Sequence, residues 1–331
     1  EATIGYALPY LRIYVGGSLF VMLAMGLNLY VTAQGFTSYS MRAVLIGAVS
    51  NIVLDPIFIF VFQWGVVGAA IATILSQALS AAFVLSFLTG KKTILHLRRE
   101  RMRVDWAQMK QALLLGLAPF IMQATEAFLN VAFNSSLQEY GGDIAVGAMT
   151  VASTVMMMLW LPANGIGQGA QPIISYNYGA RDAVRVRKAV RLMFAVLSGY
   201  IFLFWALVEL FPQAVIRIFN DDPSLLDTAT WALRLYLAGI GAFGLQLSSQ
   251  QVFMATGKAR QSLFVAILRK VILLIPLIYI LPNFFDDKVF AVFLAEPVAD
   301  VISITCCTAL FLVTFRRDMA KLAQEEAGRD A

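Results

Sequence analysis

Nine apolar runs, each of roughly 20 residues and joined by polar connections, constrain this chain more than any other feature. No water bonds the backbone inside a bilayer, so a continuous apolar run of this length crosses as a helix. The chain is 60% hydrophobic and 14% charged, whereas a soluble domain carries about 25% charged residues. We therefore expect an all-α polytopic membrane protein. The runs cover residues 11–33, 43–62, 67–88, 111–137, 145–175, 190–212, 230–256, 261–282 and 289–315.

The fifth run is longer than a bilayer needs and contains several residues that disturb helices. Because Pro162 and Pro172 remove backbone donors and Gly165 and Gly167 weaken the helix, we expect this span to be bent or partly unwound. Its glycines resemble a nucleotide-binding loop only superficially, since they do not lie between a strand and a helix. We expect them to permit close approach of a neighbouring helix instead.

Basic residues lie mainly in alternate connections, which face the cytoplasm by the positive-inside rule. This assignment leaves the C-terminus in the cytoplasm and Glu1 outside. It also places Arg269 and Lys270 with the cytoplasmic connection that begins at Lys258. Because the basic residues lie between spans, the net charge of +5 does not indicate a nucleic-acid partner. We expect a monomer whose main partner, apart from its substrate, is the lipid bilayer.

The longest polar connection, residues 89–110, divides the chain into three spans before it and six after it. Its basic and apolar residues are interleaved, which predicts an amphipathic helix on the anionic inner leaflet. We expect a partial N-terminal lobe at 1–88, a basic linker at 89–110, a C-terminal lobe at 111–316 and a cytoplasmic tail at 317–331.

A weak internal repeat relates the two parts of the chain. Gly257 follows Gly35 by 222 residues within similar short motifs, and Pro276 follows Pro56 by 220 residues in the next span. This offset covers six spans, an even number that preserves orientation, so the repeats would be parallel. The repeat predicts a twelve-helix protein with three further helices before Glu1.

Polar residues interrupt the apolar segment from Ile46 to Thr73. Asn51 and Asp55 lie four residues apart, which places them on one face of a helix. A carboxylate at the middle of a membrane costs about 2.5–3.5 kcal/mol on insertion scales, so such a group usually faces the protein interior and has a function. Pro56 follows and kinks the helix, while Thr73 returns a hydroxyl from the next span. These oxygens predict a site for a small cation or a proton.

Five segments, found in order at the expected spans, resemble the multidrug and toxic compound extrusion (MATE) transporters, in particular the bacterial MepA/DinF-like part of that family. The resemblance extends from Tyr10 to about Arg317. The segments are Ala33–Gly35, Asn51–Phe60, Trp64–Thr73, Gly116–Glu126 and Gly165–Ala180.

The resemblance implies two six-helix lobes around a cleft, of which this chain holds nine helices, in a bacterial cytoplasmic membrane. It implies efflux of amphipathic organic cations driven by entry of Na⁺ or H⁺, with no cofactor besides that coupling ion. The family's N-lobe cation site matches Asn51, Asp55 and Thr73, which would ligate the metal if the ion is Na⁺. Its fourth residue, an Asp on the first helix, falls in the segment expected before Glu1.

In the C-terminal lobe, Glu126 matches a glutamate that relatives use for coupling or for binding cationic drugs, and Gln123 adds a neutral polar group. No acid lies between 231 and 254, which argues against a second Na⁺ site in this lobe. Asp300 is a further candidate near the outer start of the last span, where solvation at the outer interface is an equal explanation. Met157 and Trp160 form a candidate drug-contacting surface or, alternatively, lipid-facing or core packing.

Two other classes of function remain as alternatives. A lipid-linked oligosaccharide or peptidoglycan-precursor flippase shares this architecture, but its cavity needs several Arg for pyrophosphate, and the spans hold almost none away from their ends. An intramembrane enzyme is disfavoured, because the single histidine, His96, and the adjacent Cys306 and Cys307 provide no metal or acid–base cluster.

Overall fold

The computed structural model describes residues 2–96, 105–219 and 223–330, which form helices and no strand. The chain divides into two compact units, Glu1–Val104 and Asp105–Ala331. The all-α fold class is thus confirmed. The predicted lobe boundaries at 88, 110 and 316 stay predictions, although the division between the units falls inside the predicted linker.

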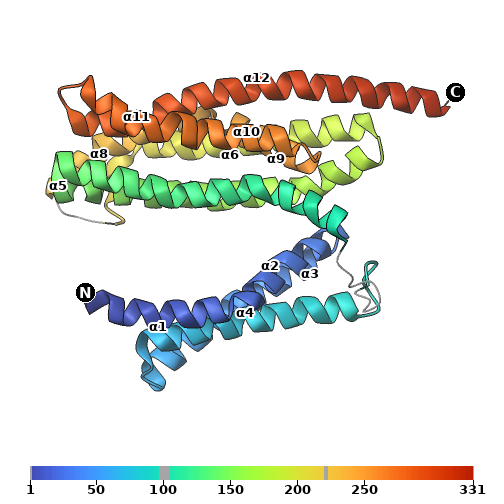
Figure 1. Ribbon diagram of the computed structural model, residues 1–331, viewed down its shortest axis with the longest axis horizontal. Helices are drawn as coiled ribbons and strands as arrows, with labels where there is room; N and C mark the ends of the chain where they lie inside the picture. The colour runs from blue at the N-terminus through green and yellow to red at the C-terminus, as the bar shows by residue number, and fades with distance from the viewer. Residues whose placement is uncertain (1, 97–104, 220–222, 331) are drawn as a thin grey trace. The chain divides into compact units, whose positions relative to one another are not determined.

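Unit 1 consists of four helices with one π-helical turn (Figure 1). Its first predicted span is two helices bent by 50° at Gly17. A small core of Val31, Ala43, Val84, Phe87 and Leu88 joins the second, third and fourth of these helices. The elements are α1 (Ala2–Gly16), α2 (Ser18–Ala33), α3 (Thr37–Pro56), the π-helix η1 (Ile57–Val61) and α4 (Gly65–Thr89).

Unit 2 is larger, and α5, α6, α8, α9 and α12 enclose its apolar core (Figure 1). Its elements are α5 (Trp106–Gly179), α6 (Ala183–Leu210), α7 (Pro212–Ile216), α8 (Pro223–Leu237), η3 (Ile240–Ala242), α9 (Phe243–Ala255), α10 (Ala259–Ile267), the π-helix η4 (Leu268–Leu274), α11 (Ile275–Ile280), η5 (Leu281–Asn283) and α12 (Lys288–Asp330).

A single glycine reverses the chain inside α5. Gly142 has φ 63° and ψ −156°, a conformation essentially restricted to glycine, and it separates two helices that correspond to the fourth and fifth predicted spans. Helical dihedrals continue from there through Pro162 and Pro172 to Gly179, so the expected partial unwinding of the fifth span is wrong. Neighbouring helices pack around this segment and hold it helical.

Among the described residues, six helices are long and apolar enough to cross a membrane, or seven if the bent pair α1 and α2 counts as one span. The predicted count of nine is therefore not confirmed. The difference has two sources: α5 contains two predicted spans, and the run 230–256 is broken at residues 238–242 into shorter helices. Hydropathy detects an apolar run, whereas helix length depends on where the backbone breaks.

The repeat is visible in the backbone at the two matched glycines. α2 ends at Ala33 and α3 begins at Thr37, with Gly35 between them at φ 86°; α9 ends at Ala255 and α10 begins at Ala259, with Gly257 at φ 72°. A residue without a Cβ adopts positive φ at little cost, so glycine ends both helices in the same way.

Two predicted polar segments differ from expectation. Residues 90–96 form turns and bends rather than an amphipathic helix, and residues 97–104 lie outside the described residues. Gln34 holds the described part of this connection, since its Oε1 accepts hydrogen bonds from the backbone N–H groups of Ile94 (2.8 Å) and Leu95 (3.0 Å). At the other end of the chain, α12 continues helical through the predicted tail to Asp330.

Candidate functional site

Asn51 and Asp55 lie one turn apart on α3, and both are partly buried. The Oδ1 atom of Asp55 and the Nδ2 atom of Asn51 are buried and have no hydrogen-bond partner in the described part of the chain. The π-helix η1 begins directly after Pro56, so the backbone beside the carboxylate departs from α-helical bonding. A buried carboxylate oxygen without a donor is costly, and a cation or a proton satisfies it.

Thr73 lies on α4, which packs closely against α3 and η1. A Cβ on Gly68 would lie 2.7 Å from the carbonyl oxygen of Phe58, so glycine permits this approach. The Thr73 hydroxyl donates to the Ala69 carbonyl at 2.9 Å, which leaves its oxygen lone pairs available to a cation. In the described residues no hydrogen bond joins Thr73 to Asn51 or Asp55.

The three residues offer one carboxylate and two neutral oxygen donors. Na⁺ or a proton suits such a set, whereas a transition metal prefers His, Cys or several carboxylates. Within the described ranges, no group of three or more His, Cys, Asp or Glu side chains is placed to hold a metal ion. The predicted site composition is thus chemically consistent, and its use stays a prediction.

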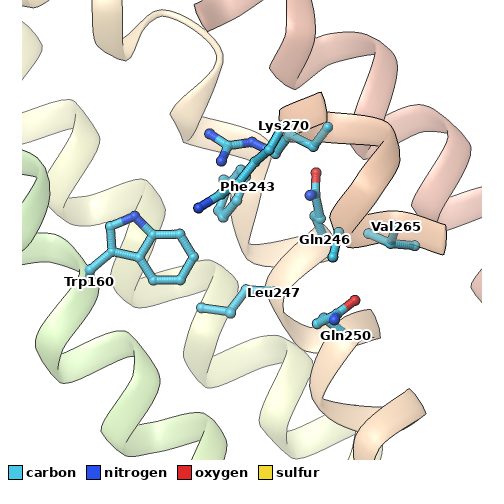
Figure 2. A pocket seen from close by; sticks show the side chains of 9 residues that line it. Trp160, Phe243, Gln246, Leu247, Gln250, Val265 and Lys270 are labelled. Carbon is cyan, nitrogen blue, oxygen red and sulfur yellow. The ribbon is translucent and has the colours of Figure 1, made fainter. Parts of the chain in front are cut away.

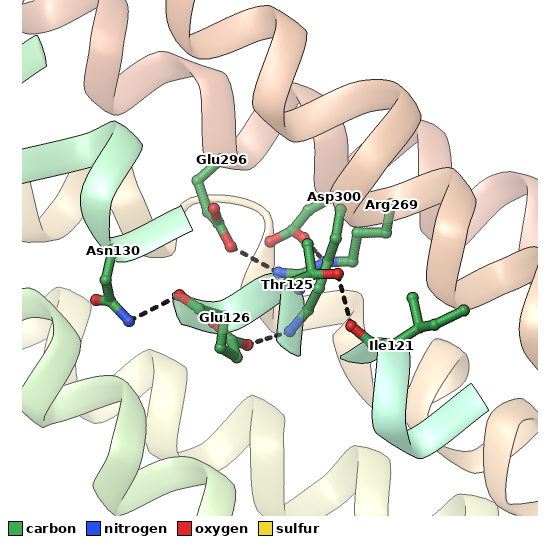
Figure 3. A network of polar contacts seen from close by, with 8 residues as sticks. Ile121, Thr125, Glu126, Asn130, Arg269, Glu296 and Asp300 are labelled. Atoms are coloured by element: carbon green, nitrogen blue, oxygen red, sulfur yellow. Dashed lines mark hydrogen bonds and ion pairs between the residues drawn. The ribbon is translucent and has the colours of Figure 1, made fainter. Parts of the chain in front are cut away.

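Unit 2 contains a buried charge cluster that the sequence analysis did not assemble (Figure 3). Arg269 Nε donates to Asp300 Oδ1 at 2.7 Å, and Arg269 Nη2 donates to Glu296 Oε1 at 2.6 Å. The guanidinium carbon lies 4.8 Å from the centre of the Phe243 ring. These residues are 6% (Arg269), 3% (Glu296) and 0% (Asp300) exposed. We call Arg269, Glu296 and Asp300 the Arg269 cluster.

Lys270, the next residue along the chain, pairs with a carboxylate on a different helix. Its ammonium contacts Glu126 Oε1 on α5, whereas Arg269 contacts α12. Both basic residues lie in the π-helix η4, which has a wider turn than an α-helix, and both are buried. Glu126 differs from the other acids, because 49% of its side chain is exposed.

These positions correct two predictions. Arg269 and Lys270 do not belong to a cytoplasmic connection, because they lie near the middle of the apolar segment Ala259–Asn283. Asp300 is not solvated at the outer interface, because it is 0% exposed and, like Glu296, binds Arg269 inside the unit. Counting basic residues assigns every Lys and Arg to a connection, which fails where carboxylates on another span compensate the charge.

The remaining candidate residues, Gln123, Met157 and Trp160, differ in how far their side chains are exposed. Gln123 is exposed, and Met157 is exposed at 63%. Trp160 is partly buried and meets the Phe243 ring edge to face, with 5.4 Å between ring centres. The structure does not bring Met157 into the core.

Trp160 and Phe243 line a small pocket together with residues of α9, α10 and η4 (Figure 2). Its volume is about 30 Å³, which has room for water rather than for a drug-sized molecule. Gln246 Oε1 is buried in this region without a hydrogen-bond partner among the described residues. The lining residues are Trp160, Phe243, Gln246, Leu247, Gln250, Val265, Ala266, Arg269 and Lys270.

Comparisons with known proteins agree on one family. The MatE family model matches residues 119–280. The multidrug export protein MepA of Staphylococcus haemolyticus is 24% identical over 298 residues, which are 89% of this chain and 65% of that protein. MepA of Staphylococcus aureus is 24% identical over 318 residues, 96% of this chain and 68% of that protein. The chain therefore spans about two thirds of the length of these relatives.

Solved structures give the same result. The MATE multidrug transporter DinF-BH is 34% identical with a TM-score of 0.84, covering 95% of this chain and 69% of that one. A MATE crystal structure in the bent conformation is 21% identical with a TM-score of 0.87, covering 98% of this chain and 72% of that one. The 21% identical structure supports the fold alone, whereas DinF-BH, at 34% identity, also supports membership of the family.

Proposed function

Since the chain belongs to the MATE family of transporters, we propose that it exports amphipathic organic cations in exchange for inward-moving Na⁺ or H⁺. Its homologues are multidrug transporters rather than enzymes. Apolar helices long enough to cross a bilayer, together with the bacterial relatives, support a multi-pass protein of the bacterial inner membrane. We further propose that it acts as a monomer, without a cofactor and with its C-terminus in the cytoplasm.

The observation that carries this proposal is the buried, unpartnered carboxylate oxygen of Asp55. A proton or Na⁺ at Asp55, with oxygens of Asn51 and Thr73 beside it, removes the cost of this group. Ion binding then favours one conformation of the lobe, and a drug that prefers another conformation competes with the ion. Such coupling is reciprocal, so each ligand lowers the affinity for the other by the same factor.

Glu126 supports the substrate class. Its side chain is 49% exposed, so its carboxylate is open to an approaching organic cation. The flippase alternative needs guanidinium groups open to pyrophosphate. Contrary to our expectation, Arg269 is buried within a span. Its guanidinium is already paired with the Glu296 and Asp300 carboxylates, so it is not available to bind pyrophosphate.

Efflux of a fluorescent cationic dye from proteoliposomes tests the proposal. The full-length protein is reconstituted under an imposed Na⁺ or H⁺ gradient, with Asp55→Asn as the test variant. Asp286→Asn, which changes an exposed carboxylate, is the matched control. We expect Asp55→Asn to abolish gradient-dependent efflux and the control to retain it. Efflux that is unchanged in Asp55→Asn and still driven by the gradient would refute the role of Asp55.

A further inference from the structure

The ion pair between Lys270 and Glu126 is asymmetric. The lysine side chain is 7% exposed, whereas the glutamate side chain is 49% exposed. The ammonium therefore reaches the carboxylate from inside the unit, and the other side of the carboxylate is open. A second cation is able to approach Glu126 without first unfolding anything around it.

Nearby charges keep Lys270 directed at Glu126. Arg269 already binds Glu296 and Asp300, the other acids close to η4. Tyr236 is a further titratable group in this region and is buried beside the Arg269 cluster. Of the three described carboxylates that pair with Arg269 or Lys270, only that of Glu126 is also exposed.

The structure also offers the Lys270 ammonium a second hydrogen-bond acceptor. Its side chain lines the pocket of about 30 Å³, and Gln246, whose Oε1 is buried and lacks a hydrogen-bond partner in the described residues, lines the same pocket (Figure 2). A carbonyl oxygen accepts a hydrogen bond from an ammonium, and the four-carbon lysine stem turns readily. The pocket is able to receive the ammonium after it leaves Glu126.

We propose that Lys270 is an internal counter-cation that competes with the transported organic cation for Glu126. Resting on the proposed function, this inference deepens it: a monovalent organic cation binds Glu126 by displacing the Lys270 ammonium into the pocket beside Gln246. Uncharged compounds gain nothing from this exchange. Lys270 therefore sets the affinity for cations without setting the affinity for neutral aromatic compounds.

Equilibrium binding of tetraphenylphosphonium to the full-length protein in lipid nanodiscs tests this inference. Uncharged triphenylphosphine oxide serves as the neutral probe. We expect Lys270→Met to raise the affinity for the cation about three- to fivefold, which corresponds to the upper part of the range for release of one partly exposed ion pair. Affinity for the neutral probe should stay within about twofold of wild type, less than 0.5 kcal/mol.

A double-mutant cycle separates displacement from a general electrostatic effect. In a Glu126→Gln background the gain from Lys270→Met should vanish, because the site of competition is gone. The double variant removes both charges together and so leaves neither group unpaired; Lys270→Gln is a second variant in case Lys270→Met does not fold. Equal cation affinity in wild type and Lys270→Met, or a gain that persists with Glu126→Gln, would overturn the inference. If no variant binds the cation, the proposed function itself fails.

Discussion

Arg269→Met is the most informative test of how unit 2 is held together. The substitution keeps an unbranched side chain of moderate length but removes the charge that bonds Glu296 and Asp300 at 2.6 and 2.7 Å. Each charge-assisted bond contributes about 1.5–3 kcal/mol, so loss of two corresponds to roughly 3–6 kcal/mol. Measured losses on breaking buried ion pairs, about 3–5 kcal/mol, fall in the same range.

This loss is measurable as a shift in melting temperature. For a unit of this size, about 1 kcal/mol corresponds to roughly 2–4 °C, so we expect Arg269→Met to lower the apparent melting temperature by about 10 °C. A thiol-reactive dye reports unfolding through Cys307, which is buried; Cys306→Ser removes the exposed thiol next to it.

The decisive comparison is with the triple variant Arg269→Met/Glu296→Gln/Asp300→Asn. It leaves no buried charge in the Arg269 cluster, and replacing a whole buried ion cluster by neutral groups is often tolerated. We expect it to melt several degrees above Arg269→Met. A single variant that melts within about 2 °C of wild type, or a triple variant no more stable than the single one, would show that the cluster is not paired as described.

Two further predictions concern the backbone of unit 2 and an ion pair between its helices. Gly142→Ala should destabilise the protein by about 1–3 kcal/mol in the same melting assay, because φ 63° with ψ −156° excludes a Cβ, whereas Gly116→Ala, where an added Cβ meets nothing within 4 Å, should not. Lys258 and Asp318 form a 2.9 Å ion pair that is largely buried. A double-mutant cycle with Lys258→Met and Asp318→Leu should give a coupling free energy of about 1 kcal/mol. Additive effects of the two substitutions on stability would contradict this pairing.

Much of the helical architecture follows from the sequence, because the thickness of a bilayer sets helix length. α4 occupies 65–89 where hydropathy predicts 67–88, and α6 occupies 183–210 where hydropathy predicts 190–212. The run 230–256 shows where this reasoning stops. Hydropathy averages over its glycines and does not detect that the backbone leaves the α-helix at residues 238–242.

Some residues of the candidate sites can be recognised in the sequence, and others cannot. Asn51 and Asp55 are recognisable in the sequence because a carboxylate in an apolar run has no compensating charge nearby in the chain. Arg269 and Lys270 are not, because a charge count cannot see partners 27 to 144 residues away. A signal is nevertheless present: Glu296 and Asp300 are one turn apart in an apolar span and together require a positive charge from another helix.

The order of residues in the chain gives the buried charges of unit 2 a consequence for biosynthesis. As the segment Ala259–Asn283 enters the membrane, Glu126 has already been synthesised and is available to Lys270, but Glu296 and Asp300 have not. Arg269 thus reaches the hydrocarbon about 30 residues before its partners, at an insertion cost of roughly 2.5–3.5 kcal/mol. We expect this segment to wait at the translocon until α12 emerges, so that Arg269 enters the bilayer together with the carboxylates that compensate its charge.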